Sequence, residues 1–208
     1  MKDLLLADIG NTHFHIYDGQ KVEHLSYEDA IAKYASSELY YISVKHQLAE
    51  EIAQISNWKN ISEWMHIEGE YDTMGIDRKA LCLSHSDGLF VDAGSAITVD
   101  VVENGHYVGG FILPGLQAYI ESYKSISPAL DTNLSQKLNL NELPTTTKEQ
   151  ISYGIIASIK ALIDKHSTAK TLYFTGGDGK FLSTFFEGAI YDEILIFTGM
   201  QQAIGVKG

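Results

Sequence analysis

The hydrophobic pattern of the chain predicts short strands that alternate with helices. The run from Leu4 to Ile9 is typical of a buried strand, and Gly10 ends it. A second strand from His13 to Tyr17 leads into Asp18-Gly19, a pair that favours tight hairpins because both positions tolerate positive φ. Far along the chain, apolar residues at helical spacing predict a long helix from Lys148 to His166. Strands interleaved with helices indicate the α/β class.

The other predicted elements are shorter. Strands are expected at Lys21–Leu25, Leu39–Val44, His106–Ile112 and Thr171–Phe174, and helices at Tyr27–Ala35, Leu48–Ile55, Asp77–His85, Gln117–Lys124 and Lys180–Phe186.

The beginning of the chain recurs in its second half. The segment from Leu89 to Gly94 follows the plan of Leu5 to Gly10, and a strand from Ser95 to Val102 then reaches the hairpin pair Asn104-Gly105. The aspartates of the two copies, Asp8 and Asp92, lie 84 positions apart, and the hairpin glycines, Gly19 and Gly105, lie 86 apart. Repetition of strand, turn, strand, hairpin and strand predicts two similar halves. We expect an N-terminal lobe at residues 1–87 and a C-terminal lobe at residues 88–208.

Composition narrows the possible partners. Of the 208 residues, 45% are hydrophobic, which is enough for a core, and 15 basic residues face 27 acidic ones, a net charge of -12. A nucleic-acid groove needs a concentrated Lys/Arg surface, so this class of partner is disfavoured. A polyanion such as ATP would have to be held by backbone amides and metal ions rather than by bulk attraction.

The sequence also predicts a cytoplasmic protein without a membrane segment. The N-terminal apolar stretch is too short for a signal peptide, and no uncharged run approaches the ~20 apolar residues of a membrane span. Cys82, the single cysteine, excludes an internal disulfide and a cysteine-based zinc site.

Two Asp-x-Gly turns are candidates for phosphate binding. In Asp8-Ile9-Gly10-Asn11-Thr12, the amides after the strand could donate to phosphate oxygens, and Asp8 could hold Mg²⁺ through water. An ordinary turn explains this segment alone equally well. The second copy, Asp92 to Thr98, favours the phosphate-binding interpretation, because two such hairpins could bracket a metal–triphosphate.

A third candidate is the glycine-rich turn Gly176-Gly177-Asp178-Gly179, which follows a strand. Glycines there would let a flat adenine or ribose approach the backbone, although a plain helix-entry turn is equally consistent with the segment. The turn is not a Walker A loop, because Phe181 follows Lys180 where Ser or Thr is required.

Two further motifs are weaker when read alone. In Gly75-Ile76-Asp77-Arg78, Asp77 could accept a proton from a substrate hydroxyl, and Arg78 could pair with a carboxylate or phosphoryl group. The start of an ordinary helix is nevertheless the favoured interpretation of this segment.

His13 and His15 share one face of a strand, as in some metal sites. With no third ligand identifiable in the sequence, surface histidines are favoured.

Taken in order, these motifs resemble the type III pantothenate kinases, members of the superfamily of actin, sugar kinases and Hsp70. The matching segments are Asp8–Thr12, Gly75–Arg78, Asp92–Asp100, Gly109–Gly115 and Thr175–Asp178. Each is weak alone, but together they cover nearly the whole chain.

The resemblance implies a duplicated ribonuclease-H-like fold of two similar lobes, with the active site in the cleft, and a homodimer. It implies transfer of the γ-phosphoryl group of ATP to the primary hydroxyl of pantothenate, the first step towards coenzyme A. Mg²⁺ would accompany ATP, and a monovalent cation, K⁺ or NH₄⁺, would also be needed.

Residue roles follow from the same resemblance. Asp77 would be the proton acceptor, and Asp92 would bind the monovalent cation. ATP would be bound by Asp8, Ile9, Gly10, Asn11, Thr12, His13, Phe14, His15, Ser95, Gly176 and Gly177. Pantothenate would be bound by Gly75, Ile76, Asp77, Arg78 and Thr147, with Thr145 and Thr146 adjoining the last.

The sequence departs from the family pattern at two places, and it leaves two alternatives open. Ser95 stands where the family has threonine, which keeps the hydroxyl. Tyr71 lies four residues before Gly75, whereas the family's tyrosine lies about seven before. The alternatives are a sugar kinase or phosphatase of the same superfamily, and a non-catalytic regulatory binding protein.

Overall fold

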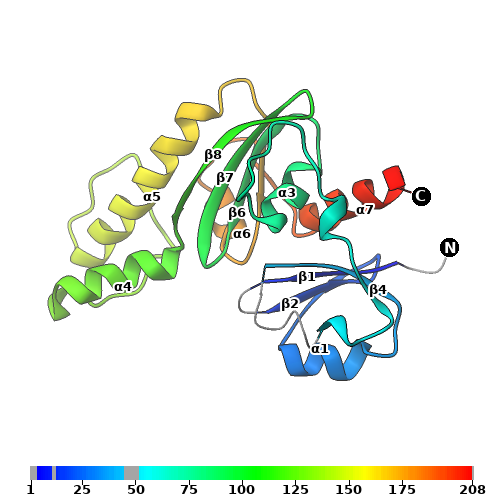
Figure 1. The fold of residues 1–208 in the computed structure, drawn as a ribbon. Coiled ribbons are helices and arrows are strands. Elements are labelled where there is room, and N and C mark those ends of the chain that lie inside the picture. Colours follow the sequence, from blue (N-terminus) through cyan, green and yellow to red (C-terminus); the bar gives the residue numbers. More distant parts are fainter. Residues whose placement is uncertain (1–3, 11–12, 45–51, 208) are drawn as a thin grey trace. The chain divides into compact units, whose positions relative to one another are not determined.

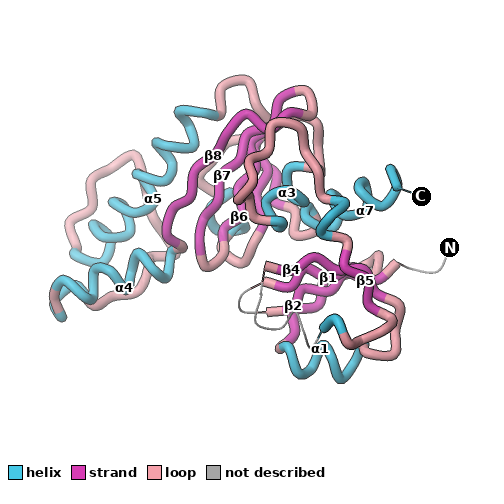
Figure 2. The backbone as a smooth tube through the Cα atoms, viewed as in Figure 1, coloured by secondary structure: helices cyan, strands magenta, loops and turns pink. Residues whose placement is uncertain are grey.

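The computed structural model describes residues 4–10, 13–44 and 52–207 (Figure 1). Residues 48–51 of the predicted helix at Leu48–Ile55 therefore fall outside the described residues. The described part contains two five-stranded sheets with helices packed on them, which confirms the α/β class (Figure 2). None of the described helices combines the length and apolar character that crossing a membrane would require.

The first sheet is mixed and has the order β3-β2-β1-β4-β5. Strands β1, β2 and β3 form an antiparallel meander, and β4 and β5 add parallel to β1 on its other side. The strands span Leu5–Ile9, Phe14–Tyr17, Val22–Leu25, Leu39–Ser43 and Trp58–Asn60 in numerical order.

The second sheet repeats this topology. Its order, β8-β7-β6-β9-β10, matches the first sheet strand for strand, and β9 and β10 are again parallel additions beside the first strand of the unit. These strands span Gly88–Ala93, Ala96–Glu103, His106–Pro114, Leu172–Thr175 and Ile190–Tyr191 in numerical order. The duplication predicted from the sequence is therefore confirmed.

Six α-helices are described in full: α1 (Tyr27–Tyr34), α3 (Ile76–Cys82), α4 (Leu116–Ile126), α5 (Thr147–His166), α6 (Gly179–Ser183) and α7 (Leu195–Lys207). Local sequence explains where two of them begin. The Ser26 hydroxyl accepts a hydrogen bond from the Asp29 amide at α1, and the Thr146 hydroxyl accepts one from the Glu149 amide at α5. Such caps satisfy amides that have no partner within the helix.

Each sheet has its own hydrophobic core. In the first, alternate residues of β1 and β2, such as Ala7 and Phe14, pack with Ala30 of α1. In the second, Leu89 and Val91 of β6 pack with the isoleucines of α5, which are buried along one face of that helix. The two-residue period of the strands and the 3.6-residue period of α5 direct these side chains to one side.

The chain forms two compact units that are not continuous in sequence. Unit 1 contains residues 1–86, 102–108 and 193–208, and unit 2 contains residues 87–101 and 109–192. The end of the β7–β8 hairpin and α7 thus belong with the N-terminal residues. These compact units differ from the predicted lobes, which were continuous at residues 1–87 and 88–208. The division of the chain into these two lobes stays a prediction.

Candidate active site

The predicted site residues divide between the two units. Residues 8–10, 13–15 and 75–78 lie in unit 1, and Asp92, Ser95, Thr147, Gly176 and Gly177 lie in unit 2. Asn11 and Thr12, both predicted to bind ATP, lie outside the described residues.

The first Asp-x-Gly turn follows β1. Asp8 is 8% exposed, and the Gly10 amide donates to the His13 carbonyl oxygen over 3.1 Å. The Tyr27 hydroxyl donates to the Gly10 carbonyl oxygen over 2.7 Å, which fixes the turn against α1. The side chains of Ile9 and Phe14 are fully buried in the core, so any contact of these two residues with a ligand would come from the backbone.

The Gly-x-Asp-Arg segment forms the start of α3. Gly75 is the N-cap residue, and Asp77 lies in the first turn, where its Oδ1 accepts a hydrogen bond from the Arg78 amide over 2.8 Å. A carboxylate in the first turn is favoured by the positive end of the helix dipole. Asp77 keeps partial exposure, whereas Arg78 is only 6% exposed.

Two tyrosines hold the Arg78 guanidinium. Its Nη1 donates to the Tyr71 hydroxyl over 2.6 Å, and its Nη2 donates to the Tyr107 hydroxyl over 3.2 Å. The two rings lie 6.0 Å apart, and the guanidinium carbon lies 5.9 Å from the Tyr71 ring centroid. Despite its shifted position in the sequence, Tyr71 is thus a direct neighbour of Arg78.

Sequence reasoning missed Tyr107, which is 29 residues from Arg78. Its backbone is anchored by a hydrogen bond from its amide to the Glu68 carbonyl oxygen over 2.7 Å, beside the bridge between Glu68 and His106. Gly69, at φ +84°, lets this approach occur, because a Cβ there would lie 2.5 Å from the Tyr107 carbonyl oxygen. The contact between Tyr107 and Arg78 joins residues far apart in the sequence, so no local sequence pattern predicts it.

In unit 2, the second Asp-x-Gly turn meets the glycine-rich turn after β9. Asp92 and Thr175 are paired at the carboxyl ends of the parallel strands β6 and β9. The Asp178 amide donates to the Ala93 carbonyl oxygen over 2.9 Å. Gly176, at φ +84°, has the Asp92 Oδ1 and the Ala93 carbonyl where a Cβ would project. Two motifs more than 80 residues apart therefore form one structure.

A third glycine joins this group at the start of α4. The Gly115 amide donates to the Ser95 carbonyl oxygen over 3.2 Å, and a Cβ on Gly115 would collide with the Gly94 and Ser95 carbonyls. The start of α4 is thereby held against Ser95, a predicted ATP contact.

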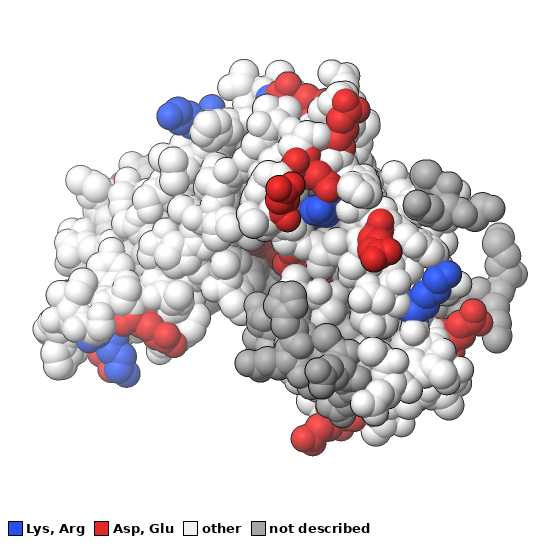
Figure 3. All heavy atoms as spheres, viewed as in Figure 1, with Lys and Arg blue, Asp and Glu red and all other residues white. Residues whose placement is uncertain are grey.

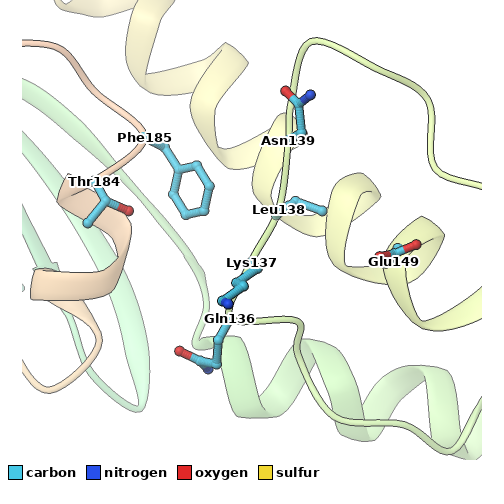
Figure 4. Close-up of a pocket in the computed structure, with 7 residues that line it drawn as sticks. All are labelled: Gln136, Lys137, Leu138, Asn139, Glu149, Thr184 and Phe185. Carbon is cyan, nitrogen blue, oxygen red and sulfur yellow. The ribbon is translucent and has the colours of Figure 1, made fainter.

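Thr147 lies elsewhere in unit 2, as the first residue of α5, and is exposed. The Thr146 hydroxyl is already used, since it donates to the Glu149 carboxylate over 2.8 Å and accepts from the Glu149 amide. Glu149 also lines an open cavity of about 560 Å³ with Phe185, Thr184 and residues 136–139 (Figure 4). Of the three adjoining threonines, Thr146 has a structural role as the helix cap.

The charges of the described residues bear on how a polyanion could bind. On the face in Figure 3, the Lys and Arg side chains of these residues are scattered and form no continuous basic surface. Within the same residues, no group of three or more His, Cys, Asp or Glu side chains has the arrangement of a metal site.

The carboxylates nevertheless fit the cations that the sequence resemblance implies. Mg²⁺ in phosphoryl-transfer sites is bound by one or two carboxylates, with water and phosphate oxygens as its other ligands. The buried Asp8 Oδ1 beside the Gly10 turn is compatible with that pattern. Asp92 offers a carboxylate oxygen packed against Gly176, and oxygen ligands suit hard cations.

Comparison with known proteins gives the family. The sequence profile of the type III pantothenate kinase family matches residues 59–169. A type III pantothenate kinase of Helicobacter hepaticus is 41% identical over 202 residues, which cover 97% of this chain and 98% of the relative. One from Campylobacter jejuni is 39% identical over 201 residues, covering 97% of this chain and 96% of the relative.

Solved structures agree in fold. A crystal structure from Campylobacter jejuni, described as a conserved Baf family transcriptional activator, has a TM-score of 0.89 at 39% identity and covers 98% of each chain. A structure from Sinorhizobium meliloti described as a 2-dehydro-3-deoxygalactonokinase, at 11% identity and TM-score 0.54, covers 98% of this chain and 96% of the other and is similar in fold. With a profile match over half the chain and full-length relatives near 40% identity, this chain belongs to the type III pantothenate kinase family.

Proposed function

We propose that the residues described above carry out the reaction of this family, the ATP-dependent phosphorylation of pantothenate that begins coenzyme A synthesis. The observation that carries the function is the full-length similarity to type III pantothenate kinases. The assignment of roles to single residues is our own proposal.

Asp77 is proposed as the proton acceptor for the primary hydroxyl of pantothenate. Support comes from its partial exposure and from the hydrogen bond with the Arg78 amide, which orients the carboxylate. In phosphoryl transfer, positioning and charge neutralisation account for most of the catalysis, so Asp77 serves mainly to orient the nucleophile and then takes its proton.

Arg78, with Gly75, Ile76 and Thr147, is proposed to bind pantothenate. A guanidinium matches the geometry of a carboxylate, and pantothenate carries one. Tyr71 and Tyr107 hold two of the guanidinium nitrogens, so less rotamer entropy is lost when the substrate binds.

ATP is proposed to contact residues 8–15, Ser95, Gly176 and Gly177. Backbone amides at glycine-containing turns bind phosphate oxygens without a basic surface, which suits a chain of net charge -12. Gly115 joins this set through its contact with Ser95.

Two cations are part of the proposal. Asp8 would hold Mg²⁺ through water, and Asp92 would hold K⁺ or NH₄⁺. When bound, these ions neutralise phosphate charge during transfer. We also infer that the enzyme acts as a homodimer in the cytoplasm.

A coupled assay of ADP release tests the function. We expect release that depends on pantothenate and Mg²⁺ and that rises when K⁺ or NH₄⁺ replaces Na⁺. Preference for a hexose over pantothenate would contradict the substrate assignment. Activity that ignores the monovalent ion would contradict the role of Asp92 while leaving the kinase assignment intact.

A further inference from the structure

Three side chains form a row across the first sheet. Asp8 of β1 is paired with His15 of β2, and His15 is paired with His24 of β3. Directly paired residues on adjacent strands point to the same face of a sheet. His13 precedes His15 by two positions and therefore shares this face. The sequence offered no third histidine near His13 and His15, but strand pairing supplies His24.

The two paired histidines are in direct contact. Their Nδ1 atoms lie 2.6 Å apart, and the rings are 4.9 Å apart in an edge-to-face arrangement. The ring of His13 lies 6.2 Å from that of His15. Burial, together with the smaller effects of the nearby His24 and His13, lowers the pKa of His15 to about 4. His15 is therefore neutral at physiological pH and keeps a nitrogen lone pair.

Two converging imidazole nitrogens are suited to a transition-metal ion. At metal–nitrogen distances of ~2.0–2.1 Å, two ligands on one ion lie roughly 2.9 Å apart at a right angle and roughly 3.3 Å apart in a tetrahedron. The Nδ1 atoms would need to separate by roughly 0.3 to 0.7 Å, and His24 is exposed at the surface. Imidazole favours Ni²⁺, Cu²⁺ and Zn²⁺ over Mg²⁺ and K⁺.

We propose that His15 and His24 bind one divalent transition-metal ion on the outer strands of the first sheet. The pair alone forms the site, with solvent at the remaining positions, since no three-residue cluster of metal ligands occurs among the described residues. This site differs in chemistry from the proposed Mg²⁺ and K⁺ sites, which use oxygen ligands. It does not rest on the proposed kinase function, because binding is measured without ATP.

Isothermal titration with Ni²⁺ and with Zn²⁺ tests the site, using the tag-free, chelator-treated full chain. We expect the wild type to show one saturable site per chain that His24→Gln weakens at least tenfold. His166→Gln, which removes a histidine from the end of α5 in unit 2, is the matched control and should bind like the wild type. His24→Cys should restore Zn²⁺ binding, because a thiolate is also a zinc ligand.

Two results would overturn the proposal: absence of a saturable site in the wild type, or unchanged binding in His24→Gln. Because His24 has no role in the proposed kinase site, His24→Gln should keep kinase activity in buffer that contains Mg²⁺ and K⁺ but no transition metal, which shows that it is folded. If His24→Gln were unstable, His24→Cys decides the question, since failure of this variant to bind Zn²⁺ also contradicts the site.

Discussion

Asp77 and Arg78 are neighbours in the sequence, but their surroundings differ. The Asp77 carboxylate is partly exposed and bonded to its own helix, whereas the Arg78 side chain is buried and held by two phenols. Exposure leaves Asp77 accessible to a substrate hydroxyl. Burial and two donated hydrogen bonds give Arg78 a fixed direction, which suits recognition of a carboxylate.

Replacement of the proposed proton acceptor should separate catalysis from binding. Asp77→Asn keeps the size of the side chain and the oxygen that accepts from the Arg78 amide, but it removes the base. We expect kcat to fall by roughly 100-fold or more. The affinity for ATP, measured by titration calorimetry, should stay unchanged. Turnover at the wild-type rate would remove Asp77 from the mechanism.

Loss of the Tyr107 hydroxyl should weaken substrate binding more than turnover. Tyr107→Phe deletes the acceptor of the Arg78 Nη2 hydrogen bond but keeps the ring. Since hydrogen bonds to charged groups contribute about 1.5–3 kcal/mol, we expect KM for pantothenate to rise by roughly 10- to 100-fold with kcat little changed.

Steady-state kinetics with both substrates measure this effect. Tyr34→Phe is the control, because that hydroxyl bonds to Glu23 in another part of unit 1. An equal loss of kcat in Tyr107→Phe, with KM unchanged, would show that Tyr107 does not position Arg78 for binding.

At the scale of elements, the turns after β6 and β9 depend on each other. Gly176 has a positive φ and lies against the Asp92 carboxylate and the Ala93 carbonyl, so a side chain would require the first turn to move. Its neighbour Gly177 has no atom within 4 Å of a potential Cβ. The two adjacent glycines are alike in sequence and different in structural role.

This difference gives a paired test of stability. Gly176→Ala should destabilise the protein by about 1–3 kcal/mol, from backbone strain and the collision with Ala93, and should raise KM for ATP. Gly177→Ala should change the free energy of unfolding by less than about 0.5 kcal/mol. Urea unfolding measures both variants. Equal stability of the two would mean that the contact between the turns contributes nothing.

At the scale of the whole molecule, the last helix returns to the first part of the chain. α7 packs on α3 within unit 1, where Gly199 lies against the Ala80 carbonyl, and the ring of Phe197 stacks on that of Tyr17 at 5.4 Å. The sequence reading predicted no element after residue 186. It therefore missed the helix that supports α3, which carries Asp77 and Arg78.

Two glycines of α7 test this packing. Gly199→Ala introduces a methyl group where the α3 backbone already lies, so we expect a loss of about 1–3 kcal/mol in the free energy of unfolding. Gly205→Ala, in the same helix with open space around it, should instead stabilise by about 0.5–1 kcal/mol. A stable Gly199→Ala would show that α7 and α3 can separate without cost.

Local sequence was sufficient for most of the fold. Alternating apolar residues and the Asp-Gly and Asn-Gly pairs predicted β1, β2, β3, β6, β7 and β8, because hairpins form between neighbours in the chain. The short strands β5 and β10 were missed, since three or two residues carry too little pattern to be recognised. The boundaries of α3 and α6 differ from the prediction by a few residues at their ends, where helices fray.

By itself, the sequence determined the duplicated α/β plan, the order of the motifs and the family. Each of these can be recognised from short segments of residues that are adjacent in the chain. The tertiary structure alone decided which distant residues meet: Tyr107 with Arg78, Gly176 with Asp92, and Gly115 with Ser95. These partners are set by strand pairing and by the packing of turns. A contact between distant residues depends on the folded backbone and leaves no periodic or local signal in the chain.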